Sequence, residues 1–171
     1  AVLIAAVSAI GGVSFWKLNQ ARDQSTVSSL LVLPDARVIA DFALTDHHSQ
    51  PFSLADLRGK WSLLFFGFTN CPDVCPGALF ELQRVNESMQ QTVGAKADRL
   101  QILFISVDPE RDTPTKLEQY LAYFDPGFIG ITGDQVQLLP LTRQLGIAYR
   151  IEEHESGAPL YDVAHSASIL L

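Results

Sequence analysis

Segments with the apolar pattern of buried strands alternate along the chain with segments that have the pattern of helices. Residues 61–68 (WSLLFFGF) and 100–107 (LQILFISV) are almost entirely apolar, as in central strands that are buried on both faces. Between them, residues 77–89 place apolar side chains on one side of a helix. Strands that alternate with helices in this way predict an α/β domain with a mixed sheet.

Shorter elements are expected after the second of these strands. The tripeptide at residues 112–114 (DTP) is typical of a helix start, and this helix is expected to end at residues 125–127. A third helix is expected over residues 133–146, where Pro140 would kink the helix or begin another short one. Short strands are expected at residues 38–44, 128–132, 149–151 and 166–171.

The first segment of the chain differs from the rest. Residues 1–16 carry no charge and end in a tryptophan followed by a lysine, a pair typical of the membrane–water boundary. A spanning helix needs ~20 apolar residues, so this segment is expected to be a truncated membrane anchor, with a cleaved signal peptide and a buried helix as alternatives. Residues 17–37 would be a polar tether and residues 38–171 a single domain. The apolar residues 169–171 predict that the domain continues further.

Composition and charge exclude several classes of protein. Nineteen acidic residues against 12 basic ones give a formal net charge of −7, and no window is rich in Lys or Arg, so a nucleic-acid partner is not expected. A hydrophobic content of 47% is enough for a folded core, which excludes a disordered chain. Two cysteines are too few for a disulfide scaffold or a four-cysteine zinc site.

The two cysteines are the main chemical feature. Cys71 and Cys75 lie between a buried strand and a helix, and the unpaired N–H groups of a helix N-terminus stabilise a thiolate. Sulfurs four residues apart on one turn can converge on a shared metal or on each other. The alternatives are two buried core residues, a static disulfide, a zinc site, or a redox pair, whose usual motif is C-x-x-C.

Four histidines are available to complete a metal site. Zinc would need two further ligands, but the turn position of His47 and His48 favours a solvated loop. His154 lies among acidic residues and is expected to be exposed. His165 lies where a loop gives way to the last apolar segment; such a histidine is usually structural, but α/β domains gather their ligands at strand ends and loops. A soft metal such as Cu(I) needs only two thiolates and one imidazole.

Three blocks of the sequence resemble the Sco/SenC copper-chaperone family. They are residues 65–76 (FFGFTNCPDVCP), 105–114 (ISVDPERDTP) and 161–168 (YDVAHSAS), in the order found in the family. The likeness covers about residues 38–171. It implies a thioredoxin-like α/β fold, in which a mixed central sheet is flanked by helices and extended by added N-terminal strands.

The same resemblance implies a metal site and a function. Copper, as Cu(I) or Cu(II), would be bound by Cys71, Cys75 and His165. The protein would be a metallochaperone, not a conventional enzyme, that assembles the dinuclear copper centre of cytochrome c oxidase subunit II, with other copper chaperones as further partners. A single N-terminal helix would anchor it, with the domain facing the bacterial periplasm or mitochondrial intermembrane space. The family fold continues beyond Leu171 with a strand and a helix, and many members have an acid where this chain has Ala164.

A second hypothesis uses the same cysteines for redox chemistry. As a redox-active disulfide pair, Cys71 and Cys75 would reduce the copper-ligand cysteines of an acceptor, and the protein would be a thiol–disulfide oxidoreductase. His165 would then be dispensable. A peroxide-reducing or redox-sensing protein is a third option. The acidic segments 108–112 and 152–155 are expected to be solvated surface or, alternatively, a docking face for a partner.

Overall fold

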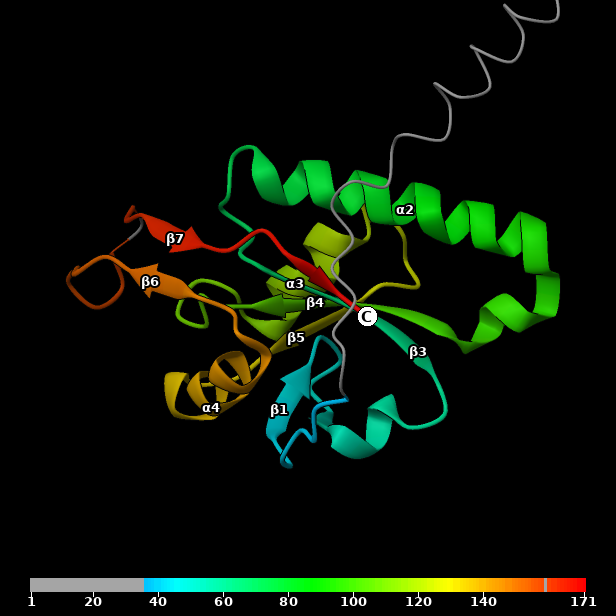
Figure 1. The fold of residues 1–171 in the computed structure, drawn as a ribbon. Coiled ribbons are helices and arrows are strands. Elements are labelled where there is room, and N and C mark those ends of the chain that lie inside the picture. Colours follow the sequence, from blue (N-terminus) through cyan, green and yellow to red (C-terminus); the bar gives the residue numbers. More distant parts are fainter. Residues whose placement is uncertain (1–35, 159) are drawn as a thin grey trace, which may run out of the picture. The chain divides into compact units, whose positions relative to one another are not determined.

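The computed structural model describes residues 36–158 and 160–171 (Figure 1). The anchor predicted at residues 1–16 therefore lies outside the described residues, as does nearly all of the tether predicted at residues 17–37. None of the helices in the two described ranges combines the length and the apolar character that crossing a bilayer demands.

A six-stranded mixed sheet forms the centre of the fold, in the order β2-β1-β5-β4-β3-β8. Strands β3 (Trp61–Gly67) and β4 (Leu100–Ser106) pair in parallel over seven residues, from Trp61 opposite Leu100 to Gly67 opposite Ser106. Strand β5 (Ile129–Thr132) pairs in parallel with β4. Three antiparallel strands complete the sheet: β1 (Ala43–Asp46), β2 (Pro51–Ser53) and β8 (Ile169–Leu170).

Helices cover both faces of this sheet (Figure 1). Helices α2 (Val74–Val93) and α3 (Pro114–Leu121) pack on one face, and α4 (Gln135–Leu145) packs on the other. Two short 3-10 helices, η1 (Leu54–Leu57) and η2 (Gly94–Arg99), precede β3 and β4. The mixed sheet with helices on both faces agrees with the α/β architecture predicted from the apolar pattern.

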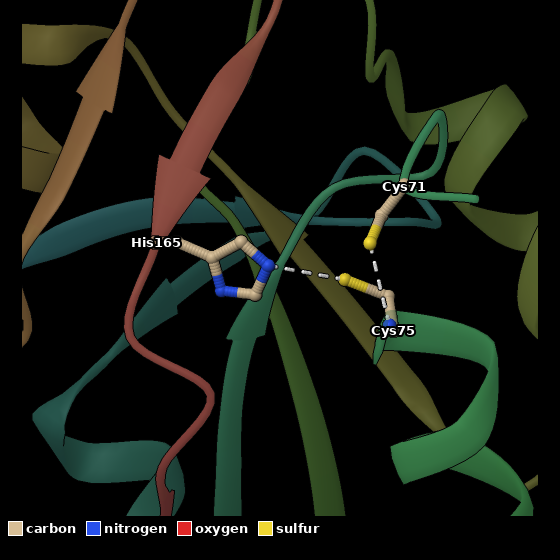
Figure 2. Close-up of side chains that lie close together, drawn as sticks. All are labelled: Cys71, Cys75 and His165. Carbon is tan, nitrogen blue, oxygen red and sulfur yellow. Dashed lines mark hydrogen bonds between the residues drawn. The ribbon is translucent and has the colours of Figure 1, made fainter. Parts of the chain in front are cut away.

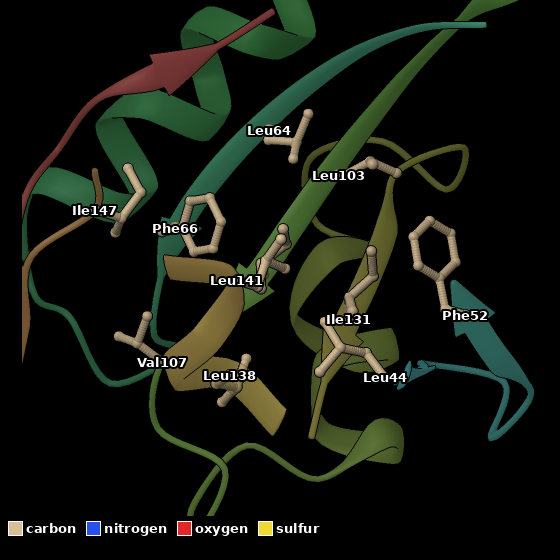
Figure 3. Close-up of a cluster of buried hydrophobic side chains, with 11 residues drawn as sticks. Leu44, Phe52, Leu64, Phe66, Leu103, Val107, Ile131, Leu138, Leu141 and Ile147 are labelled. Carbon is tan, nitrogen blue, oxygen red and sulfur yellow. The ribbon is translucent and has the colours of Figure 1, made fainter. Parts of the chain in front are cut away.

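The core consists of two layers, because alternate residues of a strand point to opposite faces. Phe66 belongs to the layer on the α4 side, together with Leu138 and Leu141 of that helix (Figure 3). Its neighbour Phe65 belongs to the layer on the α2 and α3 side. Both phenylalanines are fully buried, which explains why the β3 segment is apolar without alternation.

Helix starts follow the sequence signals with one informative difference. The hydroxyl of Thr113 accepts a hydrogen bond from the backbone N–H of Lys116, and α3 begins at Pro114, as predicted. The first helix, expected over residues 77–89, instead begins at Val74 and ends at Val93. A proline in its first turn costs nothing, because the missing N–H would have no partner there, and so the helix includes Cys75.

Three other expectations were inaccurate in detail. The strand expected over residues 38–44 begins only at Ala43. Helix α4 continues through Pro140 as a single helix and does not divide there. The strand expected over residues 166–171 is shorter, as β8, and a separate strand β7 (Val163–His165) precedes it. Strand β7 pairs with β6 (Tyr149–Ile151) in a two-stranded antiparallel sheet, in which His165 is opposite Tyr149.

Candidate metal centre

The three side chains predicted as ligands meet at one place (Figure 2). The sulfurs of Cys71 and Cys75 and a ring nitrogen of His165 all lie within 4.8 Å of one another. Among the residues that the structure describes, this is the only group of three or more Cys, His, Asp and Glu side chains so arranged. Both cysteines are free thiols. The fold thus brings together a sulfur and an imidazole from residues 90 positions apart in the sequence.

The cysteines are positioned by the end of β3 and the first turn of α2. The backbone N–H of Cys71 donates to the carbonyl oxygen of Phe68 at 3.2 Å, which turns the chain away from the strand. The backbone N–H of Cys75 then donates to the sulfur of Cys71 at 3.4 Å. N–H groups in the first turn of a helix have no carbonyl partner within the helix, so one of them is free to contact this sulfur.

Gly67, the last residue of β3, makes room for the second sulfur. A Cβ atom at this position would lie 2.7 Å from Cys75 Sγ and 2.9 Å from the ring of Phe104. Both distances are far below van der Waals contact, so the sulfur of Cys75 packs directly against the backbone of the strand. The Cys75 side chain is fully buried as a result.

His165 presents one ring nitrogen to the sulfurs and uses the other locally. Its Nδ1 lies 3.2 Å from the carbonyl oxygen of Ser166, so Nδ1–H is the donor and Nε2 keeps its lone pair. Nε2 lies 3.4 Å from Cys75 Sγ. The imidazole meets the ring of Phe68 edge-on at 5.7 Å between centroids, and that of Phe65 at 6.3 Å.

Burial determines the protonation state of the inner cysteine. Loss of solvation raises the pKa of the Cys75 thiol well above its ordinary value. In the metal-free protein the thiol therefore keeps its proton and donates a hydrogen bond to Nε2 of His165. A metal that binds as a thiolate complex must displace this proton, so metal binding at this site is expected to strengthen as pH rises.

Comparisons with known proteins agree with this geometry. The sequence model of the SCO1/SenC family matches residues 32–171. The chain belongs to the SCO1/SenC family. It is 41% identical over 153 residues to a "Putative copper-binding protein" of Stutzerimonas stutzeri, a match that covers 90% of this chain and 71% of that protein. It is 39% identical over 131 residues to the "Protein SCO2 homolog, mitochondrial" of Bos taurus, which covers 77% of this chain but 48% of the bovine protein.

Solved structures of the SCO1/SenC family share the fold. The structure of Bradyrhizobium japonicum ScoI with copper bound has a TM-score of 0.68 at 38% identity and covers 77% of this chain and 80% of that chain. The structure of yeast Sco1 with copper bound has a TM-score of 0.70 at 32% identity and covers 77% of this chain and 71% of that chain. The thioredoxin-like fold predicted from the resemblance is thereby confirmed.

A depression of about 530 Å³ opens over the site in this SCO1/SenC protein. Cys71 and His165 both line it, together with Val74, Tyr161 and Ala164. The fully buried Cys75 lies beneath it. An incoming ion or ligand therefore meets the outer sulfur and the imidazole before the inner sulfur.

The other histidines do not join the cysteines, and two of them differ from expectation. His48 is exposed, as a solvated turn predicts. His47 is only 8% exposed, and its Nδ1 accepts a hydrogen bond from the backbone N–H of Gly130 at 3.0 Å. His154, expected to be exposed, is half-buried: its ring stacks on Tyr161 at 3.6 Å between centroids. The solvated-loop interpretation was therefore wrong for His47 and for His154.

In the acidic segment 108–112, Glu110 is exposed, as a solvated surface predicts, but the two aspartates are not. Asp108 and Asp112 are fully buried. The Asp112 carboxylate accepts hydrogen bonds from the backbone N–H of Thr69 at 2.9 Å, from the Thr69 hydroxyl at 2.5 Å and from the Ser106 hydroxyl at 2.7 Å. Because Thr69 lies two residues before Cys71, the Asp112 carboxylate holds the backbone that leads to Cys71.

Sequence reasoning missed these supporting residues around the ligands. From the local pattern, Asp112 was expected at a helix start and in an acidic surface segment, and Phe68 at the end of a strand, but neither was expected to support a ligand. One signal was present: a second block matched the family, although none of its residues was needed as a ligand. A block that matches the family but carries no metal ligand indicates residues that position the ligands without binding the metal.

Proposed function

We propose that this SCO1/SenC protein binds one copper ion through Cys71, Cys75 and His165 and delivers it during assembly of cytochrome c oxidase. Two thiolates and one imidazole are soft and borderline donors that suit Cu(I), and the nitrogen also allows Cu(II). A structural zinc site would require a fourth protein ligand, and none of the described histidines, cysteines or acids joins the three. The convergence of these donors is the observation that carries the proposal.

The names of the relatives support copper as the cargo. The Stutzerimonas protein is named as copper-binding, and the Bradyrhizobium and yeast structures hold copper. We infer the finer steps from the same resemblance. The acceptor would be the dinuclear copper centre of cytochrome c oxidase subunit II, and other copper chaperones would supply the metal. The domain would be anchored beside a membrane, in the bacterial periplasm or the mitochondrial intermembrane space.

Ligand exchange is the mechanism that this site favours. The accessible ligands Cys71 and His165 line the depression, so a thiol or imidazole of an acceptor reaches the copper from that side. The buried Cys75 would release the ion last. A metal ion that keeps at least one protein ligand until the acceptor has supplied its own never needs to enter solution as a free ion.

Copper titration of the reduced domain tests the proposal. We expect one Cu(I) per chain, and a large loss of affinity in each of the variants Cys71→Ser, Cys75→Ser and His165→Ala. The control is His48→Ala, which removes an exposed imidazole outside the site and should leave binding unchanged. One-to-one binding that persists undiminished in all three ligand variants would contradict the proposal.

A thiol–disulfide oxidoreductase is the second candidate, favoured by two free thiols whose sulfurs lie within 4.8 Å of each other. In that reaction the two thiols would close to a disulfide and pass two electrons and two protons to a disulfide of the acceptor. His165 takes no part in this exchange. Oxidase assembly that survives His165→Ala but not Cys71→Ser favours the reductase, and assembly lost in both favours the copper carrier.

A further inference from the structure

The loop between β4 and α3 contacts both of the segments that carry the metal donors. At its end, Asp112 holds Thr69, two residues before Cys71. The residue before Asp112, Arg111, reaches Tyr161, four residues before His165. The two attachments come from adjacent residues of one short loop, so the loop determines how far apart the cysteine and histidine segments lie.

Arg111 makes the attachment on the histidine side. Its side chain is only 10% exposed, and its Nε donates to the carboxylate of the fully buried Asp108 at 2.5 Å. Its Nη1 donates to the backbone carbonyl of Tyr161 at 3.0 Å. The hydroxyl of Tyr161 in turn donates to Asp108. Arg111 and Asp108 thus hold both the backbone and the side chain of the residue that leads into β7.

Aromatic contacts extend this attachment to the imidazole. The guanidinium carbon of Arg111 lies 3.5 Å from the ring centroid of Tyr161 and 5.7 Å from that of Phe68. The ring of Phe68 then meets the His165 ring edge-on, with an interplanar angle of 89°. One side of the imidazole therefore rests on a ring that itself packs against the guanidinium.

A buried guanidinium has no obvious role in stability alone. Replacement of buried ion pairs by apolar residues of similar volume is often neutral or stabilising, so such a pair is weak evidence for a stabilising role. The Nη2 atom of Arg111 is buried and has no hydrogen-bond partner among the described residues, which is a further cost. What arginine offers here, and an apolar residue does not, is directional contact with Asp108, Tyr161 and Phe68 at once.

We propose that Arg111 is a positioning residue that holds His165 at the distance and angle at which its Nε2 meets the two sulfurs. Asp112 does the same for Cys71, so the two halves of the site are positioned separately by neighbouring residues of one loop. This inference rests on the proposed copper function, because it concerns the geometry of that same site.

The variant Arg111→Lys tests the inference while keeping a charge beside Asp108. Lysine has no planar group with several donors, so it cannot bond the Asp108 carboxylate and the Tyr161 carbonyl at once while it lies over the Tyr161 ring. We expect Cu(I) affinity to fall by roughly 10–100-fold, as is typical when a partner of a metal ligand is lost. The nitrogen signature, by which we mean the hyperfine splitting from the imidazole nitrogen in the electron paramagnetic resonance spectrum of the Cu(II) form, should weaken. The thiolate-to-copper charge-transfer absorption should remain.

Two further variants make the result specific. Arg84→Lys changes an exposed arginine, paired with Glu81 on the surface of α2, and should leave copper affinity and both spectra unchanged. Asp112→Asn should alter the thiolate absorption and leave the nitrogen signature intact. Thermal melting of each variant reports whether it is folded. Should Arg111→Lys not fold, Phe68→Leu removes the ring between Arg111 and His165 and is expected to weaken the same nitrogen signature.

The outcomes separate the inference from the function on which it rests. A folded Arg111→Lys protein with the affinity and nitrogen signature of the wild type overturns the inference, as does a folded Phe68→Leu protein with that signature if Arg111→Lys does not fold. An equal loss of the nitrogen signature in Asp112→Asn also overturns the inference. In that case Arg111 and Asp112 would not position the histidine and the cysteine segments separately. Failure of the wild-type protein itself to bind copper contradicts the proposed function instead.

Discussion

The cysteine segment and the histidine segment of the site are held in place by different means. The cysteines follow β3, which pairs with β4 over seven residues at the centre of a six-stranded sheet. His165 belongs to β7, a three-residue strand paired only with β6 in a separate two-stranded sheet. The first segment thus follows directly from the central sheet, whereas the second is attached to that sheet by the two-residue strand β8, which pairs with β3, and to the rest of the domain by side chains such as Arg111.

This difference divides the properties of the site between its two halves. Backbone pairing in a buried sheet is broken only when the domain unfolds, so the sulfurs have fixed positions. The two-stranded β6–β7 sheet, held by side chains and by the short β8 pairing that follows it, has fewer contacts that must break before it moves. We therefore expect changes near the cysteines to affect the stability of the domain, and changes near the histidine to affect chiefly the metal geometry.

The largest effect is expected from Phe66→Ala in β3. This change removes a fully buried ring from the core layer on the α4 side, and such truncations cost about 3–5 kcal/mol in free energy of unfolding. Both halves of the site should be lost together, as measured by chemical denaturation and copper titration. Phe80→Ala, at a position that is 54% exposed, is the control and should cost far less. Equal costs would show that β3 does not carry the fold.

An intermediate effect is expected from Asp112→Asn. An amide cannot accept all three hydrogen bonds from Thr69 and Ser106 as the carboxylate does, so the free energy of unfolding should fall by about 1–3 kcal/mol. Alkylation of Cys71 in the folded protein should become faster, because the loop before it is no longer held. Asp98→Asn changes an exposed acid and serves as the control. An unchanged alkylation rate would separate Asp112 from the cysteine loop.

A smaller effect, which needs no mutation, distinguishes the two sulfurs. Cys71 is half-buried, whereas Cys75 is fully buried and burial raises the pKa of its thiol. Each unit by which a thiol pKa rises lowers its thiolate fraction about tenfold, so Cys71 should be alkylated faster by on the order of tenfold or more. Peptide mass spectrometry of partly alkylated protein measures the ratio. In denaturant the two rates should become similar, and a folded protein in which Cys75 reacts first would refute the assignment.

The smallest effect concerns pH and the outer attachment of the histidine segment. Glu110 accepts from the backbone N–H of Gly157, which lowers the pKa of its carboxyl, and it contacts His154. The pKa of His154 is raised, first by its contact with the carbonyl of Glu152 and then by Glu110. Because the pKa of Glu110 is lowered in the folded protein, this carboxyl stabilises the fold above its ordinary pKa of 4.5. Because the pKa of His154 is raised, this imidazole stabilises the fold below its ordinary pKa of 6.5.

The contribution of this pair should thus be complete only between those two values and decline on either side. We expect Glu110→Gln to lower the melting temperature more at about pH 5.5 than at about pH 8. Differential scanning calorimetry at the two pH values measures this difference. Glu87→Gln, on the exposed side of α2, should show no such dependence. A Glu110→Gln effect that is equal at both values would show that the His154 contact carries no charge.

Most of the cysteine half could be predicted from sequence, but little of the histidine half. The uninterrupted apolar runs at residues 61–68 and 100–107 predicted the central strands, and a strand followed by a helix start placed the thiols. Both signals are local, because they depend on neighbours within one element. His165, in contrast, could be chosen among four histidines only by resemblance to a family.

What could not be predicted are contacts between residues far apart in the sequence. The burial of Asp112 depends on Thr69, 43 positions away, and the contact of Arg111 depends on Tyr161, 50 positions away. Charged residues in a loop predict solvent exposure unless the partner that buries them is known. The same reason explains why His47 and His154 were expected in solvent: their partners, Gly130 and Tyr161, lie on other elements.

The bare backbone at Gly67 also bears on which ions the site accepts. Since the inner sulfur already touches the strand, it cannot move backwards when a bulkier cation requires longer sulfur bonds. Thiophilic ions with large radii, such as mercury or cadmium, would have to displace the β6–β7 sheet instead, so a strand at the rear of the site would favour ions of smaller radius. The absence of a side chain at Gly67 would in this way influence the size of the ion that the site accepts.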